Sequence, residues 1–367
     1  MLLFVTGAVI VYYIMTPVCV VGISGFSASG KTTLIRKILP KLNKEGLTVG
    51  VLKHTHHTLK IDRKGKDTDQ IYRAGADIVL AHDDTQGFTR YKNSDRTLAD
   101  HIRRFPASLD LILVEGHKDI DLPGIWIEKG TVRKKTEEFS CGKRIVVFRD
   151  DPKYDEIVLA FIRKALKRFH SERPLLSGLL IGGKSLRMGT PKALLQIKGS
   201  TLVERSLNIL SAVSDRVMLL GSGPLPESLD KVDRLPDVLN LEGPVSGLLS
   251  AFRWAPGSTW IISSVDMPLM QRAAWEWLLS KRKPGVWAVL PKIRGSRGVE
   301  TTGAVYEPMI FEQIESLARE GMGKIQDIAQ HPKVKTPLIP DSLCHAWHNV
   351  NTPHEWEKTI FLSMKGK

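Results

Sequence analysis

The stretch GFSASGKT, from Gly25 to Thr32, restricts what this chain can fold into more than any other part of the sequence. It matches the pattern G-x-x-x-x-G-K-[ST] in full, and that pattern requires a buried strand before it and a helix after it. VCVVGIS precedes it and is typical of a buried strand, and TTLIRKILPKLNKEG follows it with apolar residues at helical spacing. The sequence therefore predicts an α/β domain with a phosphate-binding loop.

Each part of this loop has a chemical role. Backbone N–H groups of the loop and of the helix amino terminus surround phosphate oxygens. The Lys31 ammonium would meet the β- and γ-phosphates, and the Thr32 hydroxyl would ligate Mg²⁺. Glu115 ends the buried strand LDLILVE and is either the acid that holds the water shell of the metal or an ordinary strand-end acid. The residues expected to bind nucleotide here are Gly25, Phe26, Ser27, Ala28, Ser29, Gly30, Lys31, Thr32 and Thr33.

Two polar segments that follow this loop allow more than one interpretation. KHTHH, at residues 53–57, places His54 and His56 on one face of an extended segment, either as metal ligands or as part of a polar loop that faces a nucleotide or a partner. Asp67 lies near the start of a predicted helix, where it either accepts a hydrogen bond from a ligand or caps the helix.

A second glycine-rich loop, LLIGGKSLRMGTPK, runs from Leu179 to Lys192. It is not a copy of the first, because no G-K-[ST] closes it. Gly182 and Gly183 would let backbone N–H groups approach a phosphate closely, and Arg187 and Lys192 add positive charge. The strand LLSGLLI leads into the loop, and LVERSLNILSAV and RVMLLGS follow as a helix and a strand. This pattern predicts a second nucleotide-binding domain.

Two acids follow the second loop at positions where such a domain binds its ligand. STWIISSVDMP is a predicted strand whose carboxyl end carries Asp266. Ligands of open α/β sheets lie outside the carboxyl ends of the strands, so Asp266 is well placed to bind Mg²⁺. Asp237 precedes a Gly-Pro turn and a further predicted helix.

The fold class predicted from these patterns is α/β with two domains, an N-terminal P-loop NTPase-type domain and a C-terminal Rossmann-like domain. A chain of 367 residues is long enough for both. The expected boundaries are an apolar N-terminal extension at 1–16, the P-loop domain at 17–168, a linker at 169–174 and the second domain at 175–367.

The first 24 residues carry no charge, and a span of that length could cross a bilayer. Residues 18–24 are needed as the strand before the P-loop, so too few apolar residues remain to span comfortably. We expect residues 1–16 to be an extension upstream of the true start, with a membrane-associating segment or an ordered extra element as alternatives. Membrane contact is not expected.

The net charge and the cysteines bear on two questions, whether the protein binds nucleic acid and which redox compartment it occupies. The net charge of +14 is compatible with nucleic acid or with polyphosphate ligands. The sequence has no recognition helix, zinc knuckle or aromatic-studded basic strand, so we expect no nucleic-acid partner. Cys19, Cys141 and Cys344 are isolated and form no CxxC, which favours a reduced, cytoplasmic compartment.

The first half of the chain resembles the MobB family, the GTP-binding adapters of molybdenum cofactor biosynthesis. The P-loop, LKHTHH, GKDT, RAGAD and LVEGHK occur in this order and carry the resemblance over about residues 17–168. It implies nucleotide binding with weak or no turnover, in support of a partner enzyme. Cofactor-supplying and molybdoenzyme-maturation proteins are the expected partners, and a homodimer through the P-loop domain is a further expectation.

The second half resembles the MobA family through GGKSLRMGTPK, GPVSG, SVDMP and NVNTP, over about residues 175–363. That family transfers GMP from GTP to molybdopterin, so the resemblance implies a Rossmann-like nucleotidyltransferase domain. Glu-Thr-Thr-Gly replaces the usual Pro-Leu-containing stretch of a basic pterin-side loop, so this chain departs from the family's pattern on the acceptor side. The implied nucleotide-binding residues are Leu180, Ile181, Gly182, Gly183, Lys192, Asp237 and Asp266, and the implied acceptor-binding residues are Asn349, Asn351 and Arg297.

The expected reaction is attack by the terminal phosphate of Mo-molybdopterin on the α-phosphorus of GTP, with pyrophosphate leaving. Catalysis is then positioning and charge neutralisation by Arg187, Lys192 and Asp266, with Mg²⁺ on Asp266. A molybdopterin cytidylyltransferase is the nearest alternative, and a non-catalytic GTP-dependent chaperone or regulator is another. Fusing an adapter to a transferase would hold the two sites at high effective concentration.

Overall fold

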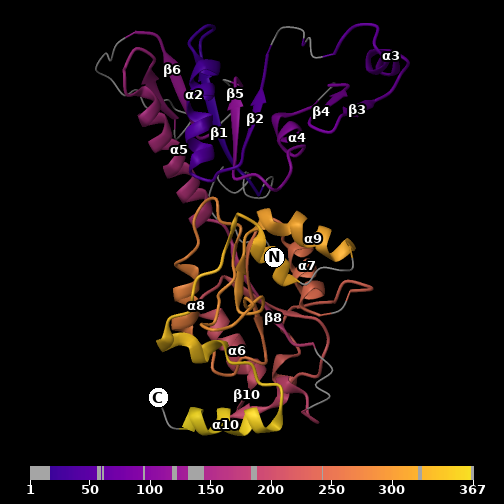
Figure 1. Cartoon of the computed structure of the whole chain (residues 1–367), viewed down its shortest axis with the longest axis vertical. Coiled ribbons are helices and arrows are strands. Elements are labelled where there is room, and N and C mark those ends of the chain that lie inside the picture. Colours follow the sequence, from indigo (N-terminus) through magenta and orange to yellow (C-terminus); the bar gives the residue numbers. More distant parts are fainter. Residues whose placement is uncertain are drawn as a thin grey trace.

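The computed structural model describes residues 17–55, 59, 62–93, 96–117, 122–130, 144–182, 188–241, 243–320 and 325–364. These residues form two α/β domains, one above the other in Figure 1. The predicted fold class is confirmed. Residues 1–16, to which the extension was assigned, lie outside the described part of the chain. Among the described residues, we find no helix with the length and apolar character needed to cross a membrane.

The N-terminal domain is built on a five-stranded parallel sheet in the order β2-β5-β1-β6-β7. Its strands are β1 (Cys19–Gly25), β2 (Val49–Lys53), β5 (Leu111–Glu115), β6 (Gly124–Glu128) and β7 (Arg144–Phe148). β1 and β5 are buried along their whole length, as their continuous apolar runs predict for a parallel sheet covered on both faces.

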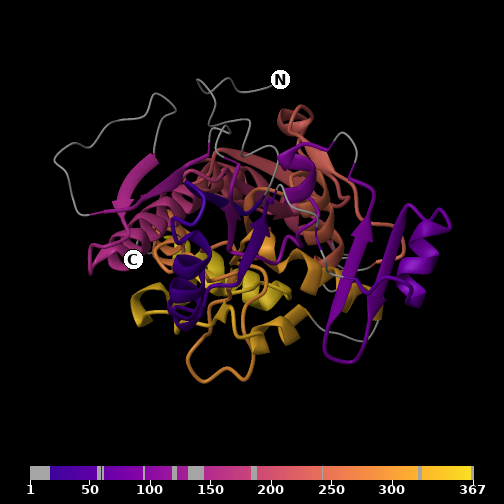
Figure 2. The same cartoon turned by 90° about the horizontal axis from the view of Figure 1, so that it is seen from above.

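Helices cover both faces of this sheet. α2 (Lys31–Lys44) and α5 (Tyr154–Ser171) pack on one face, and the short helix α4 (Leu98–Ile102) packs on the other. A separate unit of α3 (Asp67–Arg73) and the hairpin β3 (Ile78–His82) and β4 (Gly87–Tyr91) projects beyond β2, as Figures 1 and 2 both show.

The C-terminal domain has a seven-stranded sheet in the order β12-β11-β8-β13-β15-β14-β16, in which β15 runs antiparallel to both of its neighbours. Its strands are β8 (Leu175–Leu180), β11 (Arg216–Leu220), β12 (Arg234–Leu235), β13 (Thr259–Ser264), β14 (Ala288–Val289), β15 (Ala304–Tyr306) and β16 (Val334–Lys335). A small two-stranded sheet consists of β9 (Gln196–Ile197) and β10 (Ser200–Thr201).

Two apolar cores lie on the two faces of this sheet. α7 (Pro244–Trp254) and α9 (Phe311–Glu320) contribute to one, and α6 (Leu202–Ser211) and α8 (Arg272–Leu279) contribute to the other. α10 (Pro353–Met364) lies at the far end of the domain, at the bottom of Figure 1. The remaining helical turns are η1 (Lys192–Leu194), η2 (Glu227–Leu229), η3 (Pro308–Ile310), η4 (Ile325–Gln330) and η5 (Asp341–Trp347).

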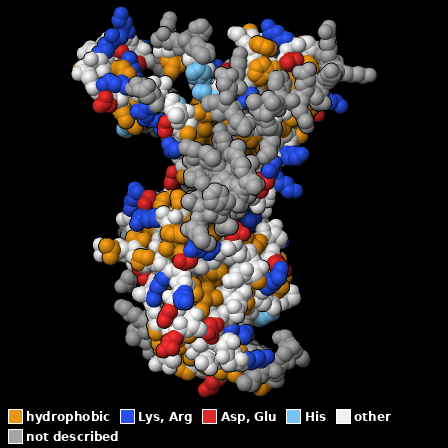
Figure 3. Space-filling model, turned by 180° about the vertical axis from the view of Figure 1, so that it is seen from behind, with side chains coloured by type: hydrophobic (Ala, Val, Ile, Leu, Met, Phe, Trp, Pro, Cys, Tyr) orange, Lys and Arg blue, Asp and Glu red, His pale blue; other side chains and the backbone are white. Residues whose placement is uncertain are grey.

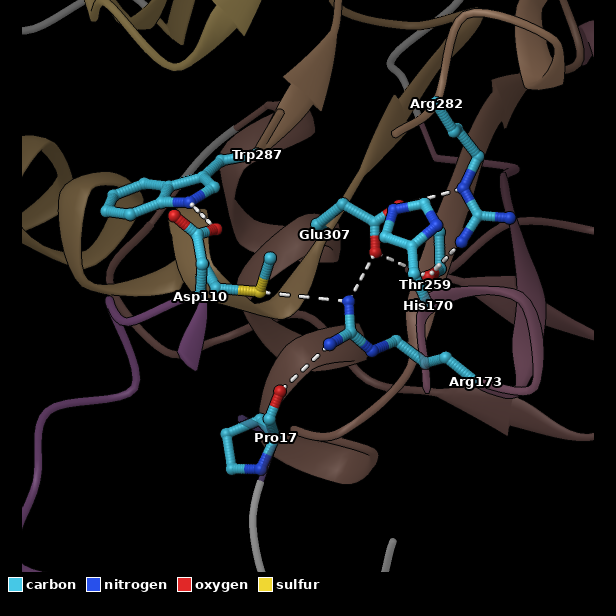
Figure 4. A network of polar contacts seen from close by, with 9 residues as sticks. Pro17, Asp110, His170, Arg173, Thr259, Arg282, Trp287 and Glu307 are labelled. Carbon is cyan, nitrogen blue, oxygen red and sulfur yellow. Dashed lines mark hydrogen bonds and ion pairs between the residues drawn. The ribbon is translucent and has the colours of Figure 1, made fainter. Parts of the chain in front are cut away.

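The segment expected as a linker is a structured part of the domain contact. α5 continues to Ser171, and the Arg173 side chain is only 3% exposed. Arg173 donates to the Glu307 carboxylate at 2.6 Å and to the Pro17 carbonyl at 2.9 Å, so it ties the start of β1 to the C-terminal domain (Figure 4).

Glu307 is the centre of this contact and is 2% exposed. Besides Arg173, its carboxylate accepts hydrogen bonds from Arg282 at 2.8 Å and from Thr259 at 2.7 Å, and it lies 3.2 Å from the His170 ring (Figure 4). Burial alone would raise the pKa of Glu307, but the charges of Arg282 and Arg173 and the His170 contact outweigh burial and hold the pKa well below its usual value.

Asp110 forms a second buried contact between the domains. It directly precedes β5, and its carboxylate accepts from the Trp287 indole at 2.9 Å and from the Lys333 ammonium at 2.8 Å. Lys333 also donates to the Gly46 carbonyl, and Thr48 donates to Asp110 through its backbone and its hydroxyl. Both partners from the C-terminal domain belong to segments that directly precede strands, namely β14 and β16.

The contact therefore joins the amino-terminal edges of the two sheets. Pro17, Thr48 and Asp110 lie just before β1, β2 and β5, while Arg173 and Thr259 lie before β8 and at the start of β13. The carboxyl ends of β1 and β8, after which the two loops begin, therefore face away from each other. The expectation that fusion gives the two sites a high effective concentration stays a prediction.

Candidate nucleotide sites

The P-loop has the backbone that its sequence predicts. β1 ends at Gly25 and α2 begins at Lys31. Gly25 has φ 150°, and a Cβ there would lie 2.6 Å from the Ile127 carbonyl oxygen, so a side chain has no room. Gly30 caps α2 with φ 97°, in the left-handed region. The loop therefore needs glycine at both of these positions.

Lys31 is folded over the loop. Its ammonium donates to the Gly25 carbonyl at 3.1 Å and to the Phe26 carbonyl at 2.7 Å. The Phe26 ring is 63% exposed and meets the Trp126 ring edge-on, with centroids 5.4 Å apart. The Lys31 ammonium is thus positioned over the loop, where it can meet the phosphates of a nucleotide.

The structure brings Thr32 and Glu115 together. The Thr32 hydroxyl donates to Glu115 Oε1 at 2.9 Å, and the Glu115 side chain is 8% exposed. Lys53, which the sequence did not single out, completes the group. Its ammonium lies 2.8 Å from Glu115 Oε1 and 3.1 Å from Thr32 Oγ1.

The structure describes two of the three polar residues that the sequence singled out after the P-loop, His54 and Asp67. The His54 and His117 rings are 4.5 Å apart, and burial, followed by the charge of His54, lowers the pKa of His117. His56 lies outside the described residues. Asp67 is the first residue of α3, whose cap is Lys66. Within the described ranges, no group of three or more His, Cys, Asp or Glu side chains could hold a metal ion.

The second loop follows β8, and its first residues pack against the loop after β11. Ile181 is 6% exposed and donates its N–H to the Leu220 carbonyl at 3.1 Å. A Cβ on Gly182 would lie 3.5 Å from the Ser222 carbonyl oxygen, so the two chain segments run close together. Leu180 points into the apolar core. Gly183 and Arg187, to which phosphate contacts were assigned, lie outside the described residues.

Lys192, Asp266 and Asn351 meet at the carboxyl edge of this sheet. The Lys192 ammonium lies 2.7 Å from Asn351 Oδ1 and 3.5 Å from Asp266 Oδ2. The Val350 N–H donates to the Asp266 carbonyl at 2.8 Å, which fixes the NVNTP segment beside the end of β13. Among the described residues, neither Asp266 Oδ1 nor Asn349 Oδ1 has a hydrogen-bond partner, although both atoms are buried.

Asp237 lies at the same edge but apart from this group. A Cβ on Gly221 would lie 3.1 Å from Asp237 Oδ2, which places the carboxylate beside the end of β11. β11 is separated from β13 by β8. Arg297 is exposed, and among the described residues no hydrogen bond or ion pair joins it to Lys192, Asp266 or Asn351.

Glu300 is a further candidate that the sequence did not indicate. Burial and then the negative charge of Asp266 raise its pKa, so the two carboxyl groups lie near each other. Glu300 belongs to the Glu-Thr-Thr-Gly stretch noted as unusual in the sequence. That departure was the only sign of it in the sequence. The fold shows that this stretch runs beside β13, since the Gly303 N–H donates to the Ile262 carbonyl at 2.7 Å.

Comparison with known proteins finds a matching family model in each half of the chain. The family model "Molybdopterin guanine dinucleotide synthesis protein B" (MobB) matches residues 20–151, and "MobA-like NTP transferase domain" matches residues 178–334. A molybdopterin-guanine dinucleotide biosynthesis adapter protein from Haemophilus influenzae is 33% identical over 130 residues, which cover 35% of this chain and 73% of that protein.

The second half has its own relatives. A Deinococcus radiodurans protein named "Probable molybdenum cofactor guanylyltransferase" is 28% identical over 180 residues, which cover 49% of this chain and 91% of that protein. The crystal structure of molybdopterin-guanine dinucleotide biosynthesis protein A from Archaeoglobus fulgidus aligns with a TM-score of 0.44 at 20% identity, over 52% of this chain and 99% of that one.

Proposed function

Because this chain belongs to the MobB family in its first half and carries a MobA-like NTP transferase domain in its second, we propose that it is a molybdenum cofactor guanylyltransferase fused to a GTP-binding adapter. The reaction is transfer of GMP from GTP to Mo-molybdopterin, which gives molybdopterin guanine dinucleotide and pyrophosphate. The observation that carries this proposal is the meeting of Lys192, Asp266 and Asn351 at the carboxyl edge of the second sheet.

The Asp266 site has the donor chemistry that Mg²⁺ requires. Carboxylate oxygens are its preferred protein ligands. In the described part of the chain, Asp266 Oδ1 is buried without a hydrogen-bond partner, and a bound cation would satisfy it. When bound, Mg²⁺ neutralises part of the triphosphate charge. In the first domain, Thr32 and Glu115 would hold the Mg²⁺ ion that accompanies a nucleotide in the P-loop.

The chain's own residues position the reactants. The acceptor phosphate forms a new P–O bond to the α-phosphorus of GTP as the bond to pyrophosphate breaks. No strong base is needed, because a phosphate is already an anion at neutral pH. Lys192 stabilises the charge on the α-phosphate, and Arg187 stabilises the leaving pyrophosphate. Asp237 accepts hydrogen bonds from the guanine N–H groups.

The acceptor side is formed by Asn349, Asn351 and Arg297. The buried Asn349 Oδ1 lacks a partner within the described residues, so it is available to orient the pterin or its phosphate. Asn351 bonds Lys192 and so links the acceptor side to the nucleotide side. Arg297 is exposed and would contact the acceptor phosphate from the outer loop.

The P-loop domain acts as the adapter, binding GTP at Gly25–Thr33 with weak or no turnover. Cofactor-supplying and molybdoenzyme-maturation proteins are its proposed partners, and a homodimer through this domain is part of the proposal. A cytoplasmic setting is supported by the free thiols of Cys19 and Cys344.

Mass analysis of the pterin product tests the reaction directly. The full chain is incubated with Mg²⁺, GTP and Mo-molybdopterin, and the expected product is the guanine dinucleotide with one pyrophosphate released per molecule. CTP in place of GTP is expected to give no product. A cytosine dinucleotide formed from CTP alone would make the chain a cytidylyltransferase. GTP binding without any dinucleotide would instead favour a non-catalytic chaperone or regulator.

A further inference from the structure

Lys53 contacts both of the groups on which a metal in the P-loop would depend. It is the last residue of β2 and lies directly opposite Glu115, the last residue of β5, in the register of the parallel pair. Its ammonium lies 2.8 Å from Glu115 Oε1 and 3.1 Å from Thr32 Oγ1. The ammonium is thus a positive charge held between the hydroxyl and the carboxylate of a P-loop metal site.

An ammonium and Mg²⁺ cannot both occupy this position. Mg²⁺ binds oxygen at about 2.0–2.1 Å, so an ion on the Thr32 hydroxyl would lie only a few ångströms from the Lys53 nitrogen. The two positive charges would repel strongly there, because Glu115 is nearly buried and water screens the pair poorly. Mg²⁺ and Lys53 therefore compete for the same two oxygens.

Lys53 is able to leave. Its side chain is 51% exposed, against 8% for Glu115, so the flexible stem can swing into solvent while the carboxylate stays in place. Lys53 also stabilises the folded domain, because a buried carboxylate such as Glu115 is strongly destabilising without a positive partner. Lys53 supplies that partner whenever no metal is bound.

We propose that Lys53 is the resident counter-cation of the P-loop site and that Mg²⁺ enters with a nucleotide by displacing the Lys53 ammonium from Thr32 and Glu115. This inference rests on nucleotide binding by the P-loop domain and not on the transfer reaction. It makes the adapter site tolerant of magnesium loss, because the site keeps a positive charge whether the metal is present or absent.

The measurable consequence is the dependence of nucleotide affinity on Mg²⁺. Without the ammonium, Mg²⁺ binds without a competitor, and nucleotide binding in the absence of Mg²⁺ meets an unbalanced Glu115 charge. The quantity to measure is a ratio, the GTP dissociation constant in EDTA divided by the GTP dissociation constant in Mg²⁺. Both effects increase this ratio, because the binding of the metal and the binding of the nucleotide are linked. We expect this ratio to rise about tenfold or more in Lys53→Met, the range for loss of a charge-assisted contact.

Calorimetric titration of the full chain with a non-hydrolysable GTP analogue measures the ratio. The P-loop site is identified as the binding that disappears when Lys31→Ala is added to the same chain. Lys41→Met is the matched control, because Lys41 lies on α2 and pairs with the nearly buried Asp155 at 2.7 Å, away from Thr32 and Glu115. Its ratio is expected to equal that of the wild type. Lys53→Arg, which keeps the charge, is expected to stay closer to wild type than Lys53→Met.

An unchanged or lower ratio in folded Lys53→Met would overturn the proposal, as would an equal rise in Lys41→Met. If Lys53→Met does not fold, Lys53→Gln removes the charge while keeping a polar group, and the same rise is expected there. Failure of Lys31→Ala to remove any GTP binding would refute both the nucleotide site and this inference. The product analysis for the transferase domain is independent of all these outcomes.

Discussion

Asp266 is the residue on which the transferase site depends most. It follows the end of β13 by two residues, its backbone carbonyl anchors Val350, and its carboxylate faces Lys192. Glu300 lies near it, and burial together with the charge of Asp266 raises the pKa of Glu300. In the proposed reaction the Asp266 carboxylate also holds Mg²⁺, so this residue has both a structural and a chemical role.

Asp266→Asn tests that task while keeping the size of the side chain. We expect guanylyl transfer to fall by about 10²-fold or more, the usual effect of losing a key electrostatic group at a transition state. Steady-state kinetics on the folded variant measures the loss. Asp341→Asn is a suitable control, since Asp341 is 81% exposed and pairs with Arg294 at 3.5 Å. Near-normal turnover in Asp266→Asn would exclude this residue as the metal ligand.

At the scale of the element, the NVNTP segment is held in place by the start of α10. Glu355 accepts hydrogen bonds from the Asn351 and Thr352 N–H groups at 2.7 and 3.0 Å, and the Thr352 hydroxyl accepts from the Glu355 N–H at 3.3 Å. This reciprocal cap, with Pro353 in the first turn, is what the sequence T-P-H-E favours. The backbone donors hold the pKa of Glu355 below its usual value, so the cap stays ionised at neutral pH.

Removing this cap should affect the acceptor side first. In Glu355→Ala, Asn351 loses its anchor to the helix, so we expect the KM for Mo-molybdopterin to rise more than the KM for GTP. Initial-rate kinetics with each substrate varied in turn measures both. Glu357→Ala changes an exposed acid of the same helix and should leave both values unchanged. An equal rise in the two KM values would mean that the cap stabilises the domain and does not orient the acceptor residues.

The elements themselves were largely predictable from the sequence. The strand, loop and helix around GFSASGKT and the strand that precedes Asp266 follow from local patterns, and the family models support the fold class. Their neighbours were not predictable. β2 lies beside β5 and not beside β1, and only that order places Lys53 opposite Glu115. Glu300 was missed for a similar reason, because it enters the site through a long-range return of the chain.

At the scale of the whole molecule, buried charged side chains mark the domain contact. Asp110 is 5% exposed, and the Lys333 side chain is 13% exposed. Such pairs are costly to separate, because each partner is left buried and unpaired. Lys and Arg are elsewhere mixed with Asp and Glu over the face shown in Figure 3.

Asp110→Ala should therefore destabilise the full chain strongly. It leaves the Trp287 indole N–H without its acceptor and the Lys333 ammonium without its counter-charge, with only the Gly46 carbonyl to accept from it. We expect a loss of about 3–5 kcal/mol in the free energy of unfolding. Denaturant unfolding followed by tryptophan fluorescence measures it. Asp77→Ala, which removes an exposed pair with Lys92, should have little effect. A similarly small effect in Asp110→Ala would show that the domains are not held together at this contact.

The joining of the two sheets at their amino-terminal edges has a consequence for how partners can bind to the molecule. Placed end to end, β1 and β8 alone account for about 40 Å at about 3.3 Å per residue. We therefore expect that one partner can bind at the P-loop while another binds at the nucleotide site of the second domain, with a spacing between them that the strands of the two sheets set.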